Sequence, residues 1–334
     1  MRDVIVPLAI DEALPPGGST LFKADGRTMG TGWSARMMLP PGADGAAVER
    51  ALQAELDEIV AQMSHWDNAS LLARYNRAPA GSWHALPPQF YEVADYALQV
   101  AQDSGGAYDP AAGELVTLWG FGSSARYDQN GFRTPDALTI GALLARRSER
   151  QPLLDRVNRR LLQPGGATLD FSSVAKGYAV DRMAACLEAR SVRHFVVEAG
   201  GELRGAGVKD NGEPWWVEIE SVPDGQARQA VVALHGLAIA TSGDYRQYFE
   251  HGAQRASHTL DPRSGQPVAN NVASVTVLAA TCMAADALST ALTVLGPKDG
   301  LAFADARGIA ARFLVRDADG LRESVSAAWS RMQQ

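Results

Sequence analysis

Two oxygen-bearing side chains in the C-terminal third of the sequence, Asp286 and Thr290, are spaced to hold a metal ion. They are four residues apart, so on a helix they project from the same face, one turn from each other. A carboxylate and a hydroxyl in this arrangement suit a hard cation such as Mg²⁺, which takes oxygen ligands and keeps part of its coordination for substrate phosphates. The alternative is an ordinary amphipathic helix, because the apolar residues Ala291, Leu292 and Val294 follow.

A histidine lies shortly before this pair, in the run Ser257-His258-Thr259-Leu260-Asp261-Pro262. The residues after it, which include a proline and Gly265, predict a loop, where a histidine is not expected merely to fill a core. The ordinary pKa of histidine lies near neutral pH, so beside a phosphate site it is a natural general base for a hydroxyl nucleophile. His258 is therefore a candidate catalytic base.

A third segment, residues 170–178, predicts a strand-to-helix junction with hydroxyl groups and one lysine. Ser172 or Ser173 is expected to cap a helix that runs to about Arg190. Helix N-termini attract phosphate because their first amides lack partners and the macrodipole is positive there, and Lys176 adds a positive charge. The segment is a candidate anion site, but the G-x-x-x-x-G-K spacing of a Walker A loop is absent.

Two segments that contain aromatic residues each have two interpretations. Trp66 follows a predicted helix and can either stack on a heterocycle or anchor the core. Asp109 precedes Pro110, which favours an extended backbone at Asp109 and presents its side chain to a ligand. The alternative for this second segment is a structural turn with Trp119 in the core.

Residues 30–35, Gly-Thr-Gly-Trp-Ser-Ala, match the loose G-x-G-x-x-A form of a dinucleotide fingerprint. The residues before Gly30 do not form a buried strand, and no amphipathic helix opens directly after Gly32. Because the fingerprint requires both, we reject a Rossmann fold here. The glycines are expected to permit a tight turn.

The composition excludes several classes of protein. The chain has 334 residues, of which 46% are hydrophobic, so it is long enough to bury a large core. Its net charge of −7 argues against general nucleic-acid binding, which needs a basic surface.

Cys186 and Cys282 are expected to be buried thiols, neither disulfide-bonded nor zinc ligands. No segment is apolar for long enough to span a bilayer. The N-terminus lacks the features of an export signal or lipid anchor, so the sequence as written predicts a cytoplasmic protein.

The order of predicted elements favours an α+β fold. Apolar spacing predicts helices over 44–63 and 88–104, and Thr134-Pro135 is expected to begin a short helix. Strands are predicted at 32–39, 194–198, 215–220, 230–234 and 272–279, with a closing hairpin at 309–315 and 321–326. Short connections between strands favour antiparallel pairing over a doubly wound sheet. Residues 1–27 are expected to be an irregular lead.

Each of these signals is weak alone, but in sequence order they resemble the blocks of the ApbE family. The resemblance covers about residues 28–300, and residues 28–334 are expected to form the family's domain, with mainly antiparallel sheets, flanking helices and two closely joined lobes. The blocks are Met29-Gly30-Thr31, Met63-Ser64-His65-Trp66 with Asn76, Tyr108-Asp109-Pro110 with Gly113 and Leu118-Trp119-Gly120-Phe121-Gly122, residues 169–178, Glu198-Ala199-Gly200-Gly201-Glu202, Thr241-Ser242-Gly243-Asp244-Tyr245, residues 257–262 and residues 286–290.

The resemblance implies an FAD:protein FMN transferase, which moves FMN from FAD onto a Thr or Ser hydroxyl of an acceptor flavoprotein and releases AMP. By similarity, Mg²⁺ or Mn²⁺ is held by Asp286, Thr290 and the backbone carbonyl of Ala175, with Ser289 beside them. His258 resembles the histidine that deprotonates the acceptor hydroxyl. The residues expected to bind FAD are Met29, Trp66, Ala107, Tyr108, Asp109, Ser172, Lys176, Tyr178 and Leu260. Family members commonly have tyrosine in place of Trp66, a conservative change for stacking.

Two other functions remain open at this point. A metal-dependent FAD pyrophosphatase would use the same metal site and give FMN and AMP, with water in place of the acceptor hydroxyl. A non-catalytic FAD-binding protein would need no base, so the presence of His258 weighs against it. Most bacterial family members are exported, often as lipoproteins, which makes a periplasmic, membrane-anchored location the alternative to a cytoplasmic one.

Overall fold

The computed structural model describes residues 3–10, 13–223, 227–251 and 254–334. Its centre is an eight-stranded sheet in the order β18-β17-β16-β11-β8-β7-β3-β2, in which every neighbouring pair is antiparallel. The predicted α+β class with mainly antiparallel sheets is confirmed. The strands are β2 (Thr20–Thr28), β3 (Thr31–Leu39), β7 (Phe195–Ala199), β8 (Glu202–Ala206), β11 (Leu237–Gly243), β16 (Val272–Ala279), β17 (Ala310–Asp317) and β18 (Gly320–Val325).

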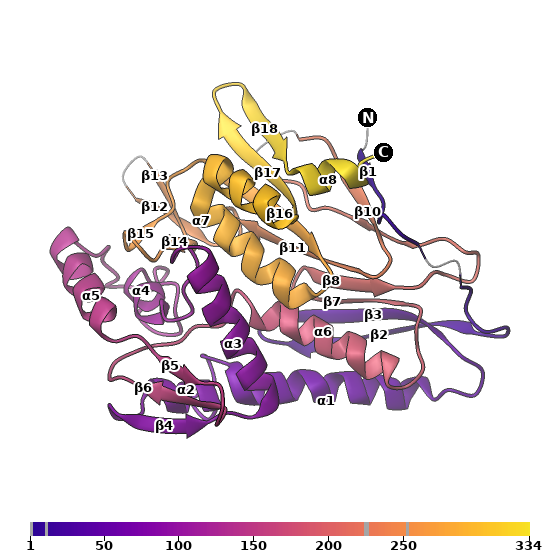
Figure 1. Ribbon diagram of the computed structural model, residues 1–334, viewed down its shortest axis with the longest axis horizontal. Helices are drawn as coiled ribbons and strands as arrows, with labels where there is room; N and C mark the ends of the chain where they lie inside the picture. Colours follow the sequence, from indigo (N-terminus) through magenta and orange to yellow (C-terminus); the bar gives the residue numbers. More distant parts are fainter. Residues whose placement is uncertain (1–2, 11–12, 224–226, 252–253) are drawn as a thin grey trace.

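Helices cover one face of this sheet (Figure 1). They are α1 (Gly45–Met63), α3 (Pro88–Asp103), α6 (Ala175–Glu188) and α7 (Cys282–Arg307). Apolar side chains recur along α1 at Val48, Leu52, Leu56 and Ile59, and all of them are buried. Together with side chains from α3, α6, β3 and β7, they form the largest apolar cluster. The helices predicted at 44–63 and 88–104 are therefore confirmed.

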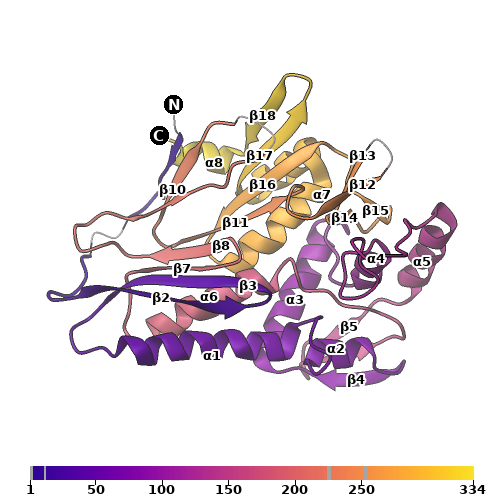
Figure 2. The same cartoon turned by 180° about the vertical axis from the view of Figure 1, so that it is seen from behind.

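A second, smaller layer covers the other face of the sheet. It contains the strands β1 (Asp3–Ile5), β9 (Trp215–Glu218) and β10 (Ala230–Leu234), in the order β1-β10-β9, and helix α8 (Ala327–Met332). Side chains from this layer pack against alternate residues of the main sheet, such as Leu203 and Ile239. Strand β1 and the C-terminal residues lie close together in this layer (Figures 1 and 2), and a bridge joins Ile5 to Gln333.

The remaining elements gather beside α3, at the left of Figure 1. Leu260 in β14 packs into an apolar cluster with side chains around α4 and α5, including Leu115, Trp119 and Ile140. The elements are α2 (Leu71–Asn76), β4 (Ser82–Ala85), α4 (Gly113–Leu118), α5 (Ala137–Glu149), β5 (Leu153–Asp155), β6 (Arg160–Gln163), β12 (Tyr248–His251), β13 (Gln254–Ser257), β14 (Leu260–Asp261) and β15 (Gln266–Pro267).

Helix α7 contains a break at Gly296, whose φ of 76° and ψ of 176° are not helical. Pro297 follows and has no backbone N–H, so it cannot donate to the carbonyl of Thr293 four residues earlier. The side chain of Asn270 donates to that carbonyl instead, at 2.8 Å. The helical segment of α7 that carries Asp286 and Thr290 thus ends before Gly296.

Several predicted boundaries need correction. The predicted irregular lead, residues 1–27, contains β1 and most of β2, although residues 1, 2, 11 and 12 lie outside the described residues. Thr134 does not cap a helix, because α5 begins at Ala137 with Asp136 as its N-cap. Ser172 and Ser173 do not cap α6 either: its N-cap is Val174, which makes no side-chain hydrogen bond. The five single strands predicted at 32–39, 194–198, 215–220, 230–234 and 272–279 and the closing hairpin are confirmed, although β9 ends at Glu218.

The rejection of a Rossmann fold is also confirmed. Residues 30–35 belong to a hairpin in which Met29 and Gly30 form a two-residue turn between β2 and β3. Both turn residues have positive φ, 49° for Met29 and 75° for Gly30, as the tightest hairpin turns require.

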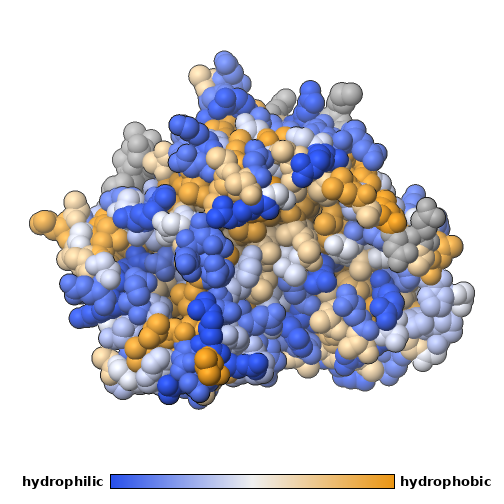
Figure 3. Space-filling model, in the orientation of Figure 1, coloured by the Kyte–Doolittle hydropathy of each residue, from blue (hydrophilic) through white to orange (hydrophobic). Residues whose placement is uncertain are grey.

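Exposed apolar residues are distributed over the surface in separate groups. Figure 3 shows hydrophilic side chains over much of the face that it presents, with several groups of apolar ones among them. No helix in the described part of the chain combines the length and the apolar character that a bilayer crossing requires. Cys186 and Cys282 are both buried free thiols, as predicted.

Candidate metal and diphosphate site

The site forms where the first turn of α6 meets α7. The backbone N–H of Gly177 donates to Oδ2 of Asp286 at 2.9 Å. A Cβ at position 177 would lie 2.2 Å from the carbonyl oxygen of Cys282, so only glycine allows the two helices to approach so closely. The pairing fixes the Asp286 carboxylate, which is buried, against the positive end of the α6 macrodipole.

The charge on Asp286 is the central electrostatic feature of the site. Burial raises the pKa of Asp286, while Lys176 and the Gly177 N–H oppose the increase. A buried carboxylate costs free energy unless cations or hydrogen-bond donors compensate it. The structure supplies one backbone donor directly, so this carboxylate can accept a further cation.

Three hydroxyl groups form a chain beside Asp286. Ser289 donates to the backbone carbonyl of Asp286 at 2.9 Å, and Ser242 Oγ lies 2.7 Å from Ser289 Oγ and 3.1 Å from Thr290 Oγ1. Because the Ser289 proton is used, Ser242 donates to Ser289 and Thr290 donates to Ser242. This order leaves the lone pairs of Thr290 Oγ1 without a protein donor among the described residues.

Sequence reasoning did not identify Ser242 as a site residue. Alternation along β11 explains its place: Ala240 and Ser242 face the helices, whereas Ile239 and Thr241 face the smaller layer. The sequence signal was the polar turn that begins at Thr241 and Ser242, which directly follows an apolar run. Nothing in that run indicated that α7 would pack against the helix face of β11.

Lys176 extends toward Asp286 and forms an ion pair with Glu202, with Nζ to Oε1 at 2.6 Å. Burial alone would lower the pKa of Lys176, but Glu202 and Asp286 outweigh it and raise the pKa. Burial raises the pKa of Glu202 to about 7, although Lys176 opposes the increase. Glu202 is a second site residue that sequence reasoning did not select, even though it ends one of the recognised blocks.

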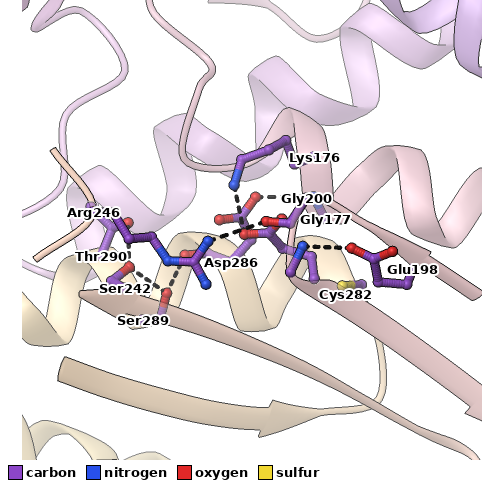
Figure 4. Close-up of polar contacts among 12 residues, drawn as sticks. Lys176, Gly177, Glu198, Gly200, Ser242, Arg246, Cys282, Asp286, Ser289 and Thr290 are labelled. Atoms are coloured by element: carbon purple, nitrogen blue, oxygen red, sulfur yellow. Dashed lines mark hydrogen bonds and ion pairs between the residues drawn. The ribbon is translucent and has the colours of Figure 1, made fainter. Parts of the chain in front are cut away.

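Arg246 completes the positive side of the site. Its guanidinium donates to the carbonyl of Gly200 at 3.4 Å and pairs with Glu220. Figure 4 shows Lys176 and Arg246 pointing toward Asp286 from two sides, with Ser242, Ser289 and Thr290 grouped beside it. Two cationic side chains and a helix N-terminus therefore lie near the Asp286 carboxylate, and their positive charge suits an anionic ligand.

The donor set fits a hard divalent cation. Among the described residues no group of three or more His, Cys, Asp or Glu side chains converges on one point, so a soft thiolate or histidine-rich metal site is absent there. Asp286 and Thr290 instead offer a carboxylate and a hydroxyl oxygen on one face of α7, and Ala175 lies in the first turn of α6, two residues before Gly177. Few protein ligands and open positions are typical of Mg²⁺ bound with substrate phosphates.

His258 lies in the connection between β13 and β14 and is half-buried. Its Nδ1 is 3.1 Å from the carbonyl oxygen of Gln247. Because a carbonyl only accepts, Nδ1 must carry the proton, and in the neutral ring Nε2 then has a free lone pair. Burial lowers the pKa of His258, with Lys176 and Arg246 acting in the same direction. The ring is therefore held as a neutral base.

The predicted FAD-binding residues fall into exposed and buried groups. Trp66 is 55% exposed, which rules out its alternative role as a core anchor. Its ring lies near that of His65, with centroids 5.1 Å apart, and the Arg126 guanidinium carbon is 5.6 Å from the Trp66 centroid. Met29 lies at the β2–β3 turn with strained positive φ, which often marks functional positions.

The segment around Tyr108 is buried. Ala107 and Tyr108 are both almost inaccessible, and Ser173 donates to the Tyr108 hydroxyl at 3.3 Å. Asp109 accepts from the Ala111 N–H at 2.8 Å and pairs with Arg147; burial raises its pKa, and Arg147 opposes this increase. Trp119 is buried and donates to the Gly265 carbonyl, so the structural interpretation of this residue is confirmed.

Ser172, Tyr178 and Leu260 differ in their accessibility. Ser172 is exposed and donates to Asp170 at 2.5 Å, with His65 Nδ1 3.4 Å from the same hydroxyl. Tyr178 is buried in the main core, and its hydroxyl donates to Glu92 at 2.8 Å. Leu260 is buried against α4 and α5. The structure thus brings Lys176, Asp286, Ser289 and Thr290 together, whereas Tyr178 directs its hydroxyl away to α3.

Comparison with known proteins gives consistent results. The model of the ApbE family matches residues 29–313. The chain is 34% identical over 322 residues to the FAD:protein FMN transferase of Klebsiella pneumoniae (strain 342), an alignment that covers 95% of this chain and 91% of that protein. It is 36% identical to the FAD:protein FMN transferase of Vibrio cholerae serotype O1, in an alignment that covers 91% of this chain and 90% of that protein. The crystal structure of the Pseudomonas stutzeri flavinyl transferase ApbE, apo form, superposes with a TM-score of 0.85 at 37% identity, covering 94% of this chain and 97% of that one.

Proposed function

The chain belongs to the ApbE family, and from this membership we propose that it transfers FMN from FAD to an acceptor flavoprotein. In this reaction a Thr or Ser hydroxyl oxygen of the acceptor forms a bond to the FMN phosphorus. The bond from that phosphorus to the bridging oxygen of the diphosphate breaks, and AMP leaves with this oxygen. The hydroxyl proton passes to a base. The flavin is carried and is not oxidised or reduced.

One observation carries this proposal: a buried carboxylate, a helix N-terminus, a lysine and a chain of hydroxyls converge at the α6–α7 junction. Phosphoryl-type transfer depends on positioning and on neutralising the charge that spreads over the phosphate oxygens. The backbone N–H of Gly177 and the ammonium group of Lys176 supply hydrogen-bond donors and positive charge at this junction. No redox-active side chain is needed, and Cys186 and Cys282 are buried free thiols.

A divalent cation is the second part of the proposal. Asp286, Thr290 and the carbonyl of Ala175 would hold Mg²⁺ or Mn²⁺, with Ser289 beside them. Such a cation supplies charge neutralisation for the diphosphate and for the departing AMP. The support from this chain is the buried Asp286 carboxylate and the unused lone pairs of Thr290.

His258 is proposed as the base that takes the acceptor proton. Its Nδ1–H donates to Gln247, so the lone pair on Nε2 is available to a hydroxyl. A hydroxyl is a weak nucleophile until a base removes its proton. The lowered pKa of His258 keeps the ring neutral at physiological pH, which is the form that can accept a proton.

The FAD pocket is proposed to lie between this site and the loops that carry Met29, Trp66 and residues 107–109. Trp66 offers an exposed ring for stacking on the flavin. Ser172, Lys176, Tyr178 and Leu260 complete the predicted set. Trp66 and Ser172 are the exposed members of this set, so we expect them to make principal side-chain contacts with FAD.

The test mixes the protein with FAD, Mg²⁺ and a candidate acceptor domain, and measures both the acceptor mass and AMP. A mass gain equal to FMN together with AMP release is the expected result. AMP without a mass gain would identify a pyrophosphatase, and bound FAD without AMP would identify a carrier. A parallel reaction with EDTA tests the cation: we expect no AMP there, and unchanged AMP release would refute the metal site.

A further inference from the structure

Glu202 is a buried carboxylate for which the proposed reaction so far has no role. It is 2% exposed, and it is the first residue of β8, paired in register with Ala199 of β7. Its Oε1 accepts from Lys176 at 2.6 Å, whereas Oε2 is buried without a hydrogen-bond partner. Because an unsatisfied buried charge is costly, such a residue requires a specific explanation.

The turn between β7 and β8 places this carboxylate against Lys176. Gly200 and Gly201 have φ values of 63° and 100°, in the left-handed region that favours glycine. A Cβ on Gly200 would lie 3.0 Å from Thr31 Cγ2 and 3.4 Å, an ordinary contact distance, from both Glu202 Oε2 and the Lys176 Cδ. The turn therefore packs directly over the lysine and the glutamate, which lie side by side.

Lys176 also has a second possible partner. It directly precedes Gly177, whose N–H binds the Asp286 carboxylate, and the charge of Asp286 acts on Lys176. Two buried carboxylates thus share one nearby ammonium group. Paired with Asp286, that ammonium would occupy the position that a divalent cation needs. The structure shows it paired with Glu202 instead.

We infer that Glu202 is a positioning residue: it keeps the Lys176 ammonium paired with Glu202 rather than with Asp286, and thereby leaves the Asp286 carboxylate available to a divalent cation. The inference rests on the cation site of the proposed function. It gives the buried Glu202 carboxylate a role, because this carboxylate competes with that of Asp286 for the ammonium group. Lys176 stays 31% exposed at its side chain, so it can still reach a phosphate oxygen when substrate arrives.

The test is a double-mutant cycle read by Mn²⁺ binding, with free Mn²⁺ measured by electron paramagnetic resonance and no FAD present. Glu202→Gln should weaken Mn²⁺ binding about tenfold, because the freed ammonium pairs with Asp286. Lys176→Met removes the ammonium and should bind Mn²⁺ at least as tightly as the wild type. The double variant Glu202→Gln/Lys176→Met should recover wild-type affinity to within about threefold.

This recovery separates positioning from two other roles. If Glu202 were itself a cation ligand, the double variant would bind as weakly as Glu202→Gln, and the inference would be overturned. Equal binding by Glu202→Gln and the wild type would overturn it as well. Absence of Mn²⁺ binding by the wild type would remove the cation site, and the inference with it. FMN transfer, measured separately by acceptor mass, would still decide whether the transferase itself stands.

Two controls keep the result interpretable. Glu213→Gln breaks an exposed pair in which Glu213 lies 3.4 Å from Lys209, and it should not change Mn²⁺ affinity. Glu202→Asp keeps a carboxylate near Lys176 and should lose less affinity than Glu202→Gln. If Glu202→Gln fails to fold in a thermal unfolding measurement, Glu202→Asp combined with Lys176→Met completes the same cycle, and the same recovery is expected.

Discussion

The two halves of the proposed site differ in how much of each is already assembled. At the α6–α7 junction, Asp286, Gly177 and the Ser242–Ser289–Thr290 hydroxyls are held by direct hydrogen bonds between helices and a central strand. Around Trp66 and His258, the side chains lie on loops or hairpin connections and are partly exposed. The first half is preorganised, and the second keeps surface free for ligands.

This difference suggests that the two halves have different functions: the α6–α7 junction, here called the rigid half, and the surroundings of Trp66 and His258, here called the open half. Rigid, mutually bonded groups suit the diphosphate, whose charge must meet fixed donors and a cation with little rearrangement. Groups on loops suit the flavin ring and a protein acceptor, which must enter and leave. Changes in the rigid half should therefore reduce the rate of reaction, whereas changes in the open half should affect ligand binding or the proton transfer.

The largest effect is expected from Asp286→Asn. The amide keeps the shape and the contact to Gly177 but removes the charge that a cation requires, so AMP release should fall by about 10³-fold. Asp299→Asn, an exposed position further along α7, is the matched control and should keep full activity. The rate of AMP formation and the thermal unfolding temperature should be measured for both variants. If Asp286→Asn folds and remains fully active, the Asp286 charge has no role in the reaction.

The substitution His258→Gln should have the next largest effect. Loss of the base should slow FMN transfer by about 10²-fold or more while FAD binding changes little. His84→Gln, on β4, serves as the control. Equal losses of transfer and of FAD binding would make His258 a residue that shapes the pocket, contrary to our assignment.

The same residue predicts the pH dependence of transfer. The pKa of His258 is depressed below its usual value of 6.5, so the neutral, active form persists to lower pH than for an ordinary histidine. The transfer rate should be flat above pH 6.5 with respect to this group and decline only as pH falls below it. An acid limb centred above pH 6.5 would contradict the burial of the ring as its cause.

Ser242→Ala tests the hydroxyl chain in the rigid half. Removal of the central hydroxyl leaves Thr290 and Ser289 unsupported, and we expect about tenfold weaker Mn²⁺ binding, as for other groups that orient metal ligands. Thr241→Val is the control on the same strand, because Thr241 bonds to Thr276 on the opposite face at 2.9 Å. It should cost folding stability without changing Mn²⁺ affinity, and an equal loss in both variants would rule out a specific role for Ser242.

The smallest effect is expected from Trp66→Ala in the open half. Loss of one exposed stacking surface should weaken FAD binding by about fivefold, on the order of 1 kcal/mol, while the rate at saturating FAD and the folding stability are retained. Trp216→Ala removes another exposed tryptophan and should leave FAD affinity unchanged. A lower saturated rate in Trp66→Ala would show that the two halves are coupled more closely than we propose.

Local pattern was sufficient for some elements but not for others. Helix α1 was predictable because its apolar residues recur at helical spacing, and strand β16 because it is a short, valine-rich run that is buried almost throughout. Strand β2, with few buried positions, was not predicted. The N-cap of α6 could not be predicted in this way, because the hydroxyls of Ser172 and Ser173 form hydrogen bonds with Asp170 and Tyr108 instead of capping the helix. A serine before a helix has several possible partners, and only the packed neighbours decide among them.

The sequence by itself determined the class of the fold, the carboxylate and hydroxyl four residues apart, and the histidine outside the core. These depend on residue types and on spacing within a single element. Only the tertiary structure decided that Ser242 supports Thr290 and that Glu202 holds Lys176, since each pair joins elements distant in sequence. The physical reason is that the alternation of a strand gives two faces, and packing alone decides which face meets the helices.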